Sequence, residues 1–221
     1  MTAPVSGARA FVHIGSIVPV RDGWLVATAR LRGGAFSPDA PKVVPDLAKA
    51  IEGRPRFTMA GLNAPIGDAL AASGGHRQCD VEARGQFGLD PNASRRTDTL
   101  AGPRAFIDAR LQEVVATLAT RHQRSLCEFL PELSFMEANG GQPLDGPPSE
   151  QSGIEERTLL LGRMPGIDRV LSADLDGVGA DELLEVAAGL WTTRRVIARM
   201  GRRLPDTPEA SADGFRMEIL R

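Results

Sequence analysis

Four acidic side chains could form a site for a divalent cation or another ligand. Glu128 follows an apolar run, and Glu132 comes four residues later. Asp181 and Glu185 are also four residues apart, which places them on one face of a helix. Carboxylate oxygens are the ligands that Mg²⁺ prefers, and hydrolases use such cations to stabilise the attacking and leaving oxygens. We therefore take Glu128, Asp181 and Glu185 as candidate catalytic residues.

A second polar group lies along residues 63–84 and could bind a ligand. Arginine guanidinium groups donate two parallel hydrogen bonds to an oxyanion, and an amide offers both a donor and an acceptor. The candidate ligand-binding residues are Asn63, His76, Arg77, Asp80, Arg84 and Glu132. Ion pairing within a helix is an alternative role for Arg77, Asp80 and Arg84, because their spacing places them on one helical face.

Each acid also has a structural interpretation. Glu128 ends a buried strand in our prediction, where an ion pair with Arg84 or Arg104 would explain it as well as a metal ion would. Glu132 follows a proline, and we expect it to be solvated in a loop. The apolar stripe of the last long helix lies opposite Asp181 and Glu185, which favours a solvated face for both.

Hydrophobic patterns and turn residues predict the elements that must position these side chains. Strands are expected over residues 9–17, 24–31, 56–62, 125–130 and 215–220. Helices are expected over residues 45–51, 78–87, 103–121, 152–162 and 180–200. Ser152 and Glu155 form a capping-box pattern at the start of one of them. A strand hairpin followed by alternating strands and helices predicts an α/β domain with a mixed sheet.

The order of the motifs resembles a bacterial family of uncharacterised domains predicted to be nucleases with a ribonuclease H-like fold. The matching segments are Gly23-Trp24, Ala64-Pro65-Ile66-Gly67, Arg77 to Arg84, Glu128 to Phe135, Gly153 to Arg157, Asp181 to Glu185 and the closing Gly214 to Ile219. The resemblance covers nearly the whole chain. It implies an α/β, ribonuclease H-like mixed sheet flanked by helices, with a metal-dependent nuclease site.

The chain departs from that family at the acids of the expected site. Gly15 stands where the family has its first-strand aspartate, and Asn63 stands where it has the next one. Glu185 is the nearest counterpart of the helix acid. Without two of the carboxylates we expect no cofactor bound with high affinity, and Mg²⁺ and Mn²⁺ are the candidates for weaker binding. Asp22 or Asp68 could substitute if the alignment is displaced.

Composition limits the class of protein. The 221 residues, with 42% hydrophobic and 24% charged side chains, are typical of one soluble domain. We expect a flexible N-terminus over residues 1–8 and a single domain over residues 9–221. No apolar run is long enough for a signal peptide or a membrane span, so we expect a cytoplasmic protein without a membrane partner. A net charge of −2 does not favour nucleic acid as a partner, and the sequence gives no oligomeric state.

Three hypotheses follow. The first is a divergent member of the predicted nuclease family with a degenerate metal site, inactive or repurposed. The second is a phosphodiesterase-type hydrolase that uses the remaining acids Glu128, Asp181 and Glu185. The third is a non-enzymatic binding protein whose cleft takes a small anionic ligand or a protein partner. A phosphate-bearing or other small-molecule substrate fits the first two.

Overall fold

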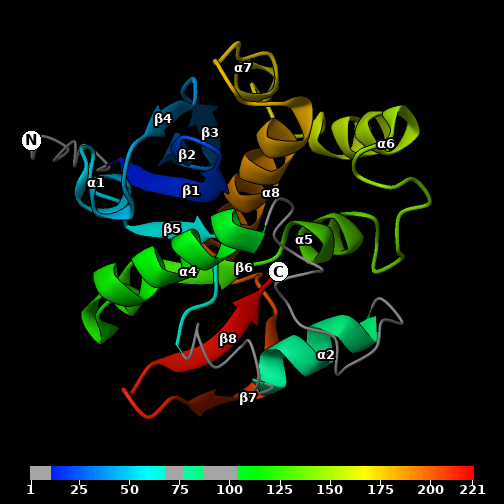
Figure 1. Ribbon diagram of the computed structural model, residues 1–221. Coiled ribbons are helices and arrows are strands. Elements are labelled where there is room, and N and C mark those ends of the chain that lie inside the picture. Colours follow the sequence, from blue (N-terminus) through cyan, green and yellow to red (C-terminus); the bar gives the residue numbers. More distant parts are fainter. Residues whose placement is uncertain (1–10, 68–76, 87–103) are drawn as a thin grey trace, which may run out of the picture.

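A mixed β-sheet runs through the molecule and carries helices on both faces (Figure 1). The computed structural model describes residues 11–67, 77–86 and 104–221. Within these ranges the strand order is β3-β2-β1-β5-β6-β8-β7, and β4 also pairs with β2. The strands are β1 (Val12–Val20), β2 (Gly23–Arg32), β3 (Ala35–Pro38), β4 (Lys42–Val44), β5 (Met59–Leu62), β6 (Leu126–Phe129), β7 (Arg203–Ala210) and β8 (Arg216–Leu220).

The central strands are parallel, and the two ends of the sheet are antiparallel. β1 pairs parallel with β5, β5 with β6, and β6 with β8. β1–β2, β2–β3 and β7–β8 pair antiparallel. This arrangement is consistent with a ribonuclease H-like α/β fold, as the sequence predicted. It also confirms that the strands predicted over residues 9–17 and 125–130 belong to one sheet.

Helices cover both faces of this sheet. They are α1 (Leu47–Glu52), α2 (Gln78–Gln86), α4 (Arg104–Thr117), η2 (Thr120–Arg124), α5 (Pro131–Ala138), α6 (Gln151–Leu161), α7 (Asp168–Leu171) and α8 (Ala180–Ile197). α8 packs along β1, β2, β5 and β6, and α5, α6 and α7 pack against α8. α4 crosses in front of β5 and β6 in Figure 1, and α2 packs on β7 and β8.

Two apolar layers hold the sheet between its helices. On one face, Ile14, Val18 and Phe129 form a buried cluster with Val186 and Leu190 of α8. On the other face a second cluster joins residues of β1, β2 and β5 to residues of α1 and α4, among them Ile17, Leu62, Leu47 and Leu111. Alternation of side chains along each strand therefore decides which helices a residue meets.

The sequence prediction missed the strands β3, β4 and β7 and the helices α5 and α7, and it shifted one helix start. β7 contains Pro205 and Pro208, which argue against a strand, but β7 is at the edge of the sheet, where proline is tolerated. Pro131, expected in a loop, opens α5 at a helical position that needs no N–H donor. α6 begins at Gln151 without a side-chain cap, so the predicted capping box of Ser152 does not form. Among the residues placed by the structure, no helix combines the length and apolar character of a membrane span.

Candidate functional site

Glu128 is held in a buried network of ion pairs at the end of β6. Its Oε1 lies 2.8 Å from Nη2 of Arg77, and its Oε2 lies 2.9 Å from Nη1. The backbone N–H of Ile66 also donates to Oε2, at 2.7 Å. Arg77 bridges onward to Asp80 through Nε and Nη2, both at 2.7 Å. The side chains of Arg77, Asp80 and Glu128 are at most 4% exposed, so the network is closed to solvent.

These contacts support the ion-pair interpretation of Glu128. They show Arg77 as a partner, in addition to the Arg84 and Arg104 that the sequence suggested as candidates. Burial by itself lowers the pKa of Arg77, but attraction to Glu128 and Asp80 outweighs it and holds that pKa well above its usual value. Arg77 therefore stays charged, and its guanidinium group already donates hydrogen bonds to both carboxylate oxygens of Glu128.

Glu132 belongs to a second ion pair and lies in a helix, not in the predicted loop, although its side chain is 39% exposed as a solvated residue would be. It lies in the first turn of α5 because Pro131 starts the helix one residue earlier. Nη2 and Nε of Arg157 donate to its two carboxylate oxygens at 2.6 Å and 3.2 Å. Arg157 is 2% exposed and also donates to the backbone oxygens of Gly146 and Gly153. This pair joins α5 to α6.

Asn63 and Glu185 meet at the carboxyl end of β5, on the face of the sheet that α8 covers. Asn63 directly follows β5 and is 1% exposed. Its Nδ2 donates to Oε2 of Glu185 at 3.2 Å, and its buried Oδ1 has no hydrogen-bond partner among the described residues. Glu185 is only partly buried. The site therefore combines a buried acceptor without a described partner, Oδ1 of Asn63, with the carboxyl group of Glu185, which solvent can still reach.

The electrostatics at Glu185 favour its neutral form. Burial, followed by the charges of Asp181, Glu182 and Glu132, raises its pKa from an ordinary 4.5 to about 8, against the opposite effect of the Asn63 hydrogen bond. At neutral pH most Glu185 side chains carry a proton. The predicted solvated face is thus correct for Asp181, which is exposed, and wrong for Glu185, which α8 directs to the sheet.

The structure does not bring Glu128 together with Glu185. Leu62 pairs in register with Glu128, so both side chains project from the same face of the sheet. Leu62 packs in the apolar cluster of α1 and α4. Asn63, the next residue, points to the opposite face, where it meets Glu185. A catalytic unit that combines Glu128 with Asp181 or Glu185 is therefore not formed.

The residue of β1 beside Asn63 is Val18, not Gly15. The Asn63 N–H donates to the carbonyl of Ile17, and Val18 is buried on the face that α8 covers. A side chain at Gly15 would point to the other face, where an added Cβ would lie 2.6 Å from the ring of Phe57. Gly15 and Asn63 therefore face opposite sides of the sheet, and the β1 residue beside Asn63 carries an apolar side chain.

A close approach of α8 to the sheet sets the depth at which Glu185 is held. An added Cβ at Gly189, one turn after Glu185, would lie 2.0 Å from the Ser16 Oγ and 2.5 Å from the Phe129 ring. Only glycine lets the helix backbone lie this close to β1 and β6. Thr193, one turn further, donates to the Gly15 carbonyl at 3.1 Å.

The remaining candidates lie on α2 or outside the described residues. Asp80 and Arg84 are buried on α2, and His76 lies outside the described residues, as does Asp68. Across the ranges that the structure covers, no group of three or more histidine, cysteine, aspartate or glutamate side chains is arranged to hold a metal ion. The residues around Asn63 do not fit a pair of cations, because Val18 offers no ligand and Asn63 offers only a neutral oxygen.

The sheet order, with polar residues at the ends of its parallel strands, defines a mixed α/β protein and is consistent with a ribonuclease H-like fold. A family model described as a protein of unknown function (DUF429) matches residues 19–210, so the chain belongs to this family. Searches of curated proteins and of solved structures gave no match.

Sequence reasoning missed two residues of the site. Val18 gave no signal, because an apolar residue in a buried strand is indistinguishable from core. Arg157 stood in the sequence only as the last residue of a motif, without an assigned role. Its spacing of four residues from Gly153 lets its guanidinium group donate to the backbone of its own helix. The motif Arg77 to Asp80 pairs with Glu128, and the motif ending in Arg157 pairs with Glu132. The motifs thus contact one another.

Proposed function

We propose that this protein is a repurposed member of its family: a binding protein that holds a small molecule through an N–H donor or a cationic group at Asn63 and Glu185. In this proposal it does not cleave phosphodiester bonds with paired cations. Val18 and Asn63 replace the ligands that such a mechanism requires, and Glu128 is already neutralised by Arg77.

The observation that carries this proposal is the buried Oδ1 of Asn63, which has no hydrogen-bond partner in the part of the chain that the structure describes. A buried polar atom without a hydrogen bond costs about 1–3 kcal/mol, so its retention needs an explanation. An N–H donor from a ligand would satisfy it. The charges of Asp181, Glu182 and Glu132 around Glu185 favour a cationic ligand and disfavour a phosphate at this site.

A second candidate is a hydrolase that uses one divalent cation. The acids that raise the pKa of Glu185 are close enough to interact with it, and a cation would relieve their mutual repulsion. Asp181 and Glu185, with the Oδ1 of Asn63, would supply its oxygen ligands. Glu128 has no part in this version, because it lies on the other face of the sheet.

Calorimetry with the diamine putrescine, and separately with Mg²⁺ and Mn²⁺, distinguishes the two. The binding proposal expects putrescine affinity to rise between about pH 6 and pH 9 as Glu185 ionises, since an alkylamine stays charged over this range. Glu185→Gln should remove that rise, and Glu155→Gln, an exposed matched control, should retain it. Metal-dependent hydrolysis of bis(p-nitrophenyl) phosphate that is lost in Glu185→Gln would instead establish the hydrolase.

A further inference from the structure

Three arginine side chains converge on one carboxylate where the β7–β8 hairpin meets α5 and α8. Glu137 of α5 has its Oε1 at 2.9 Å from Nη2 of Arg195 and 3.7 Å from Nε of Arg202. Its Oε2 is 3.7 Å from Nε of Arg221. One carboxylate balances one guanidinium, so this arginine cluster (Arg195, Arg202 and Arg221) keeps two positive charges that Glu137 does not neutralise.

Arg202 and Arg221 are directly opposite each other across the two strands. Each backbone N–H donates to the other's carbonyl, at 2.9 Å in both directions. Residues paired in this way project from the same face of an antiparallel sheet, and like charges in that position are destabilising. Glu137 offsets this repulsion only in part, because it also pairs with Arg195 at 2.9 Å, so a further anion would be attracted to the two side chains.

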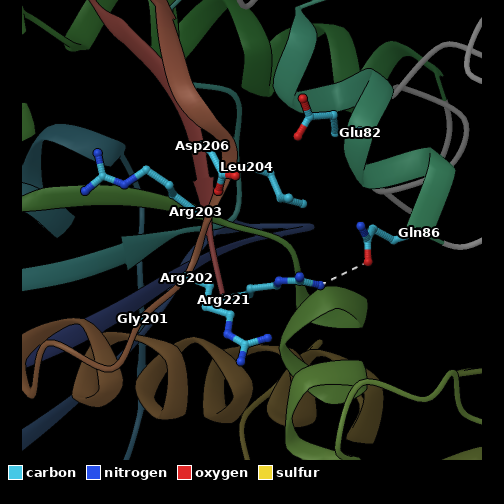
Figure 2. A pocket seen from close by; sticks show the side chains of 8 residues that line it. All are labelled: Glu82, Gln86, Gly201, Arg202, Arg203, Leu204, Asp206 and Arg221. Carbon is cyan, nitrogen blue, oxygen red and sulfur yellow. Dashed lines mark hydrogen bonds between the residues drawn. The ribbon is translucent and has the colours of Figure 1, made fainter.

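Arg202 and Arg221 also line a cleft of about 700 Å³ between the β7–β8 hairpin and α2. Figure 2 shows Arg202 and Arg221 leaving adjacent positions of the sheet, with Arg221 reaching across to Gln86 of α2. Nη1 of Arg221 donates to Oε1 of Gln86 at 3.2 Å. Pockets of about 300–1,000 Å³ are typical of small-molecule sites.

Two acids also line the cleft, but they lie away from the arginine cluster. Glu82 and Asp206 are in the upper half of the view, whereas Arg202 and Arg221 are in the lower half (Figure 2). Within the cluster, the buried Nε atoms of Arg195 and Arg221 have no hydrogen-bond partner among the described residues. Arg202, by contrast, is 69% exposed, so its guanidinium group can reach a ligand in the cleft.

We propose that Arg202 and Arg221 of this cluster bind the phosphate group of a small phosphate monoester in this cleft. A phosphate monoester carries a charge of about −1.5 to −2 at neutral pH, opposite in sign to the charge that Glu137 leaves uncompensated. The guanidinium fork binds phosphate oxygens with paired hydrogen bonds. This site is separate from Asn63 and Glu185 and does not depend on the function proposed for them.

Calorimetry at constant ionic strength with inorganic phosphate, adenosine monophosphate and adenosine tests this proposal. Phosphate and the monophosphate should bind, and adenosine should not. Arg202→Gln should weaken phosphate binding by about tenfold, the loss expected for one charge-assisted contact. Arg169→Gln removes an exposed arginine on α7 and serves as the matched control. Equal affinity in the Arg202 and Arg169 variants would overturn the proposal.

Glu137→Gln separates ligand binding from a purely structural role of the cluster. If Glu137 competes with a phosphate, the variant should bind inorganic phosphate several-fold more tightly and gain more thermal stability from it than the wild type does. Unchanged or weaker phosphate binding in a folded Glu137→Gln protein would count against the proposal. Binding of a 5′-phosphorylated oligonucleotide without binding of phosphate or the monophosphate would exclude a small-molecule ligand.

Discussion

Arg77 and Glu128 form a bidentate ion pair inside the protein, although they are 51 residues apart in the sequence. The pair ties the start of α2 to the end of β6, and the Ile66 N–H fixes the loop after β5 to the same carboxylate. The position looked catalytic in the sequence because an acid is rarely buried without a partner. In the structure that partner is an arginine.

Glu128→Gln should lower the free energy of unfolding by about 3–5 kcal/mol, because it leaves Arg77 buried and incompletely paired. Urea denaturation of this variant and of the exposed control Glu155→Gln is the direct measurement. The control should change stability by no more than about 0.5 kcal/mol. A loss below about 1 kcal/mol for Glu128→Gln would show that the network is not structural.

Glu185 should make the protein less stable as the pH rises. Its folded pKa of about 8 exceeds the ordinary 4.5, so between these values the unfolded chain loses a proton that the folded protein keeps. Stability therefore falls from about pH 5 to pH 8 and levels off above the folded pKa. Because solvent partly reaches Glu185, we expect it to contribute about 1–3 kcal/mol to this fall.

Glu185→Gln should reduce that fall, so that the variant is more stable than the wild type at about pH 8 but not at about pH 5. Thermal unfolding followed at both pH values compares the two proteins. An identical pH dependence in both would mean that Glu185 keeps an ordinary pKa.

Glu132 and Arg157 should be energetically coupled. A double-mutant cycle with Glu132→Gln and Arg157→Met should give a coupling energy of about 1–3 kcal/mol, since the Arg157 side chain is 3% exposed and the contact is bidentate. Additive losses would contradict the pairing. Because the charge of Glu132 also raises the pKa of Glu185, Glu132→Gln should lower that pKa in a carbon-13 carboxyl titration.

The position of Val18 can be tested by restoring carboxylates. The double variant Val18→Asp, Asn63→Asp should gain Mn²⁺ binding, because it places two acids side by side on the face of Glu185. Without the cation it should be less stable than the wild type, and Mn²⁺ should recover part of that loss.

Gly15→Asp combined with Asn63→Asp is the comparison, and it should gain no such binding, since Gly15 faces Phe57. Calorimetry measures Mn²⁺ binding by each variant, and thermal unfolding measures its stability with and without Mn²⁺. Mn²⁺ binding by the Gly15 variant alone would refute the register on which the site is built.

Local patterns in the sequence determined most of the secondary structure. The hairpin over β1 and β2 followed from two strand-like segments joined by an Asp-Gly turn, and α8 followed from an apolar stripe with helical spacing. β7 and α5 were missed because their prolines are tolerated at a sheet edge and at a helix start, and neither position is visible in a local window.

The sequence by itself determined the candidate site only in part. The sequence identified Asn63, Glu128 and Glu185 as polar residues at element ends, but their grouping depends on which face of the sheet each one occupies. A shift of one residue along a strand reverses that face. Leu62 and Glu128 share one face of the sheet, and Asn63 meets Glu185 on the other. Only the tertiary structure therefore separated the buried ion pair of Glu128 from the partly exposed carboxyl group of Glu185. The register of β1 likewise placed Val18 beside Asn63, because strand pairing is set by contacts between distant parts of the chain.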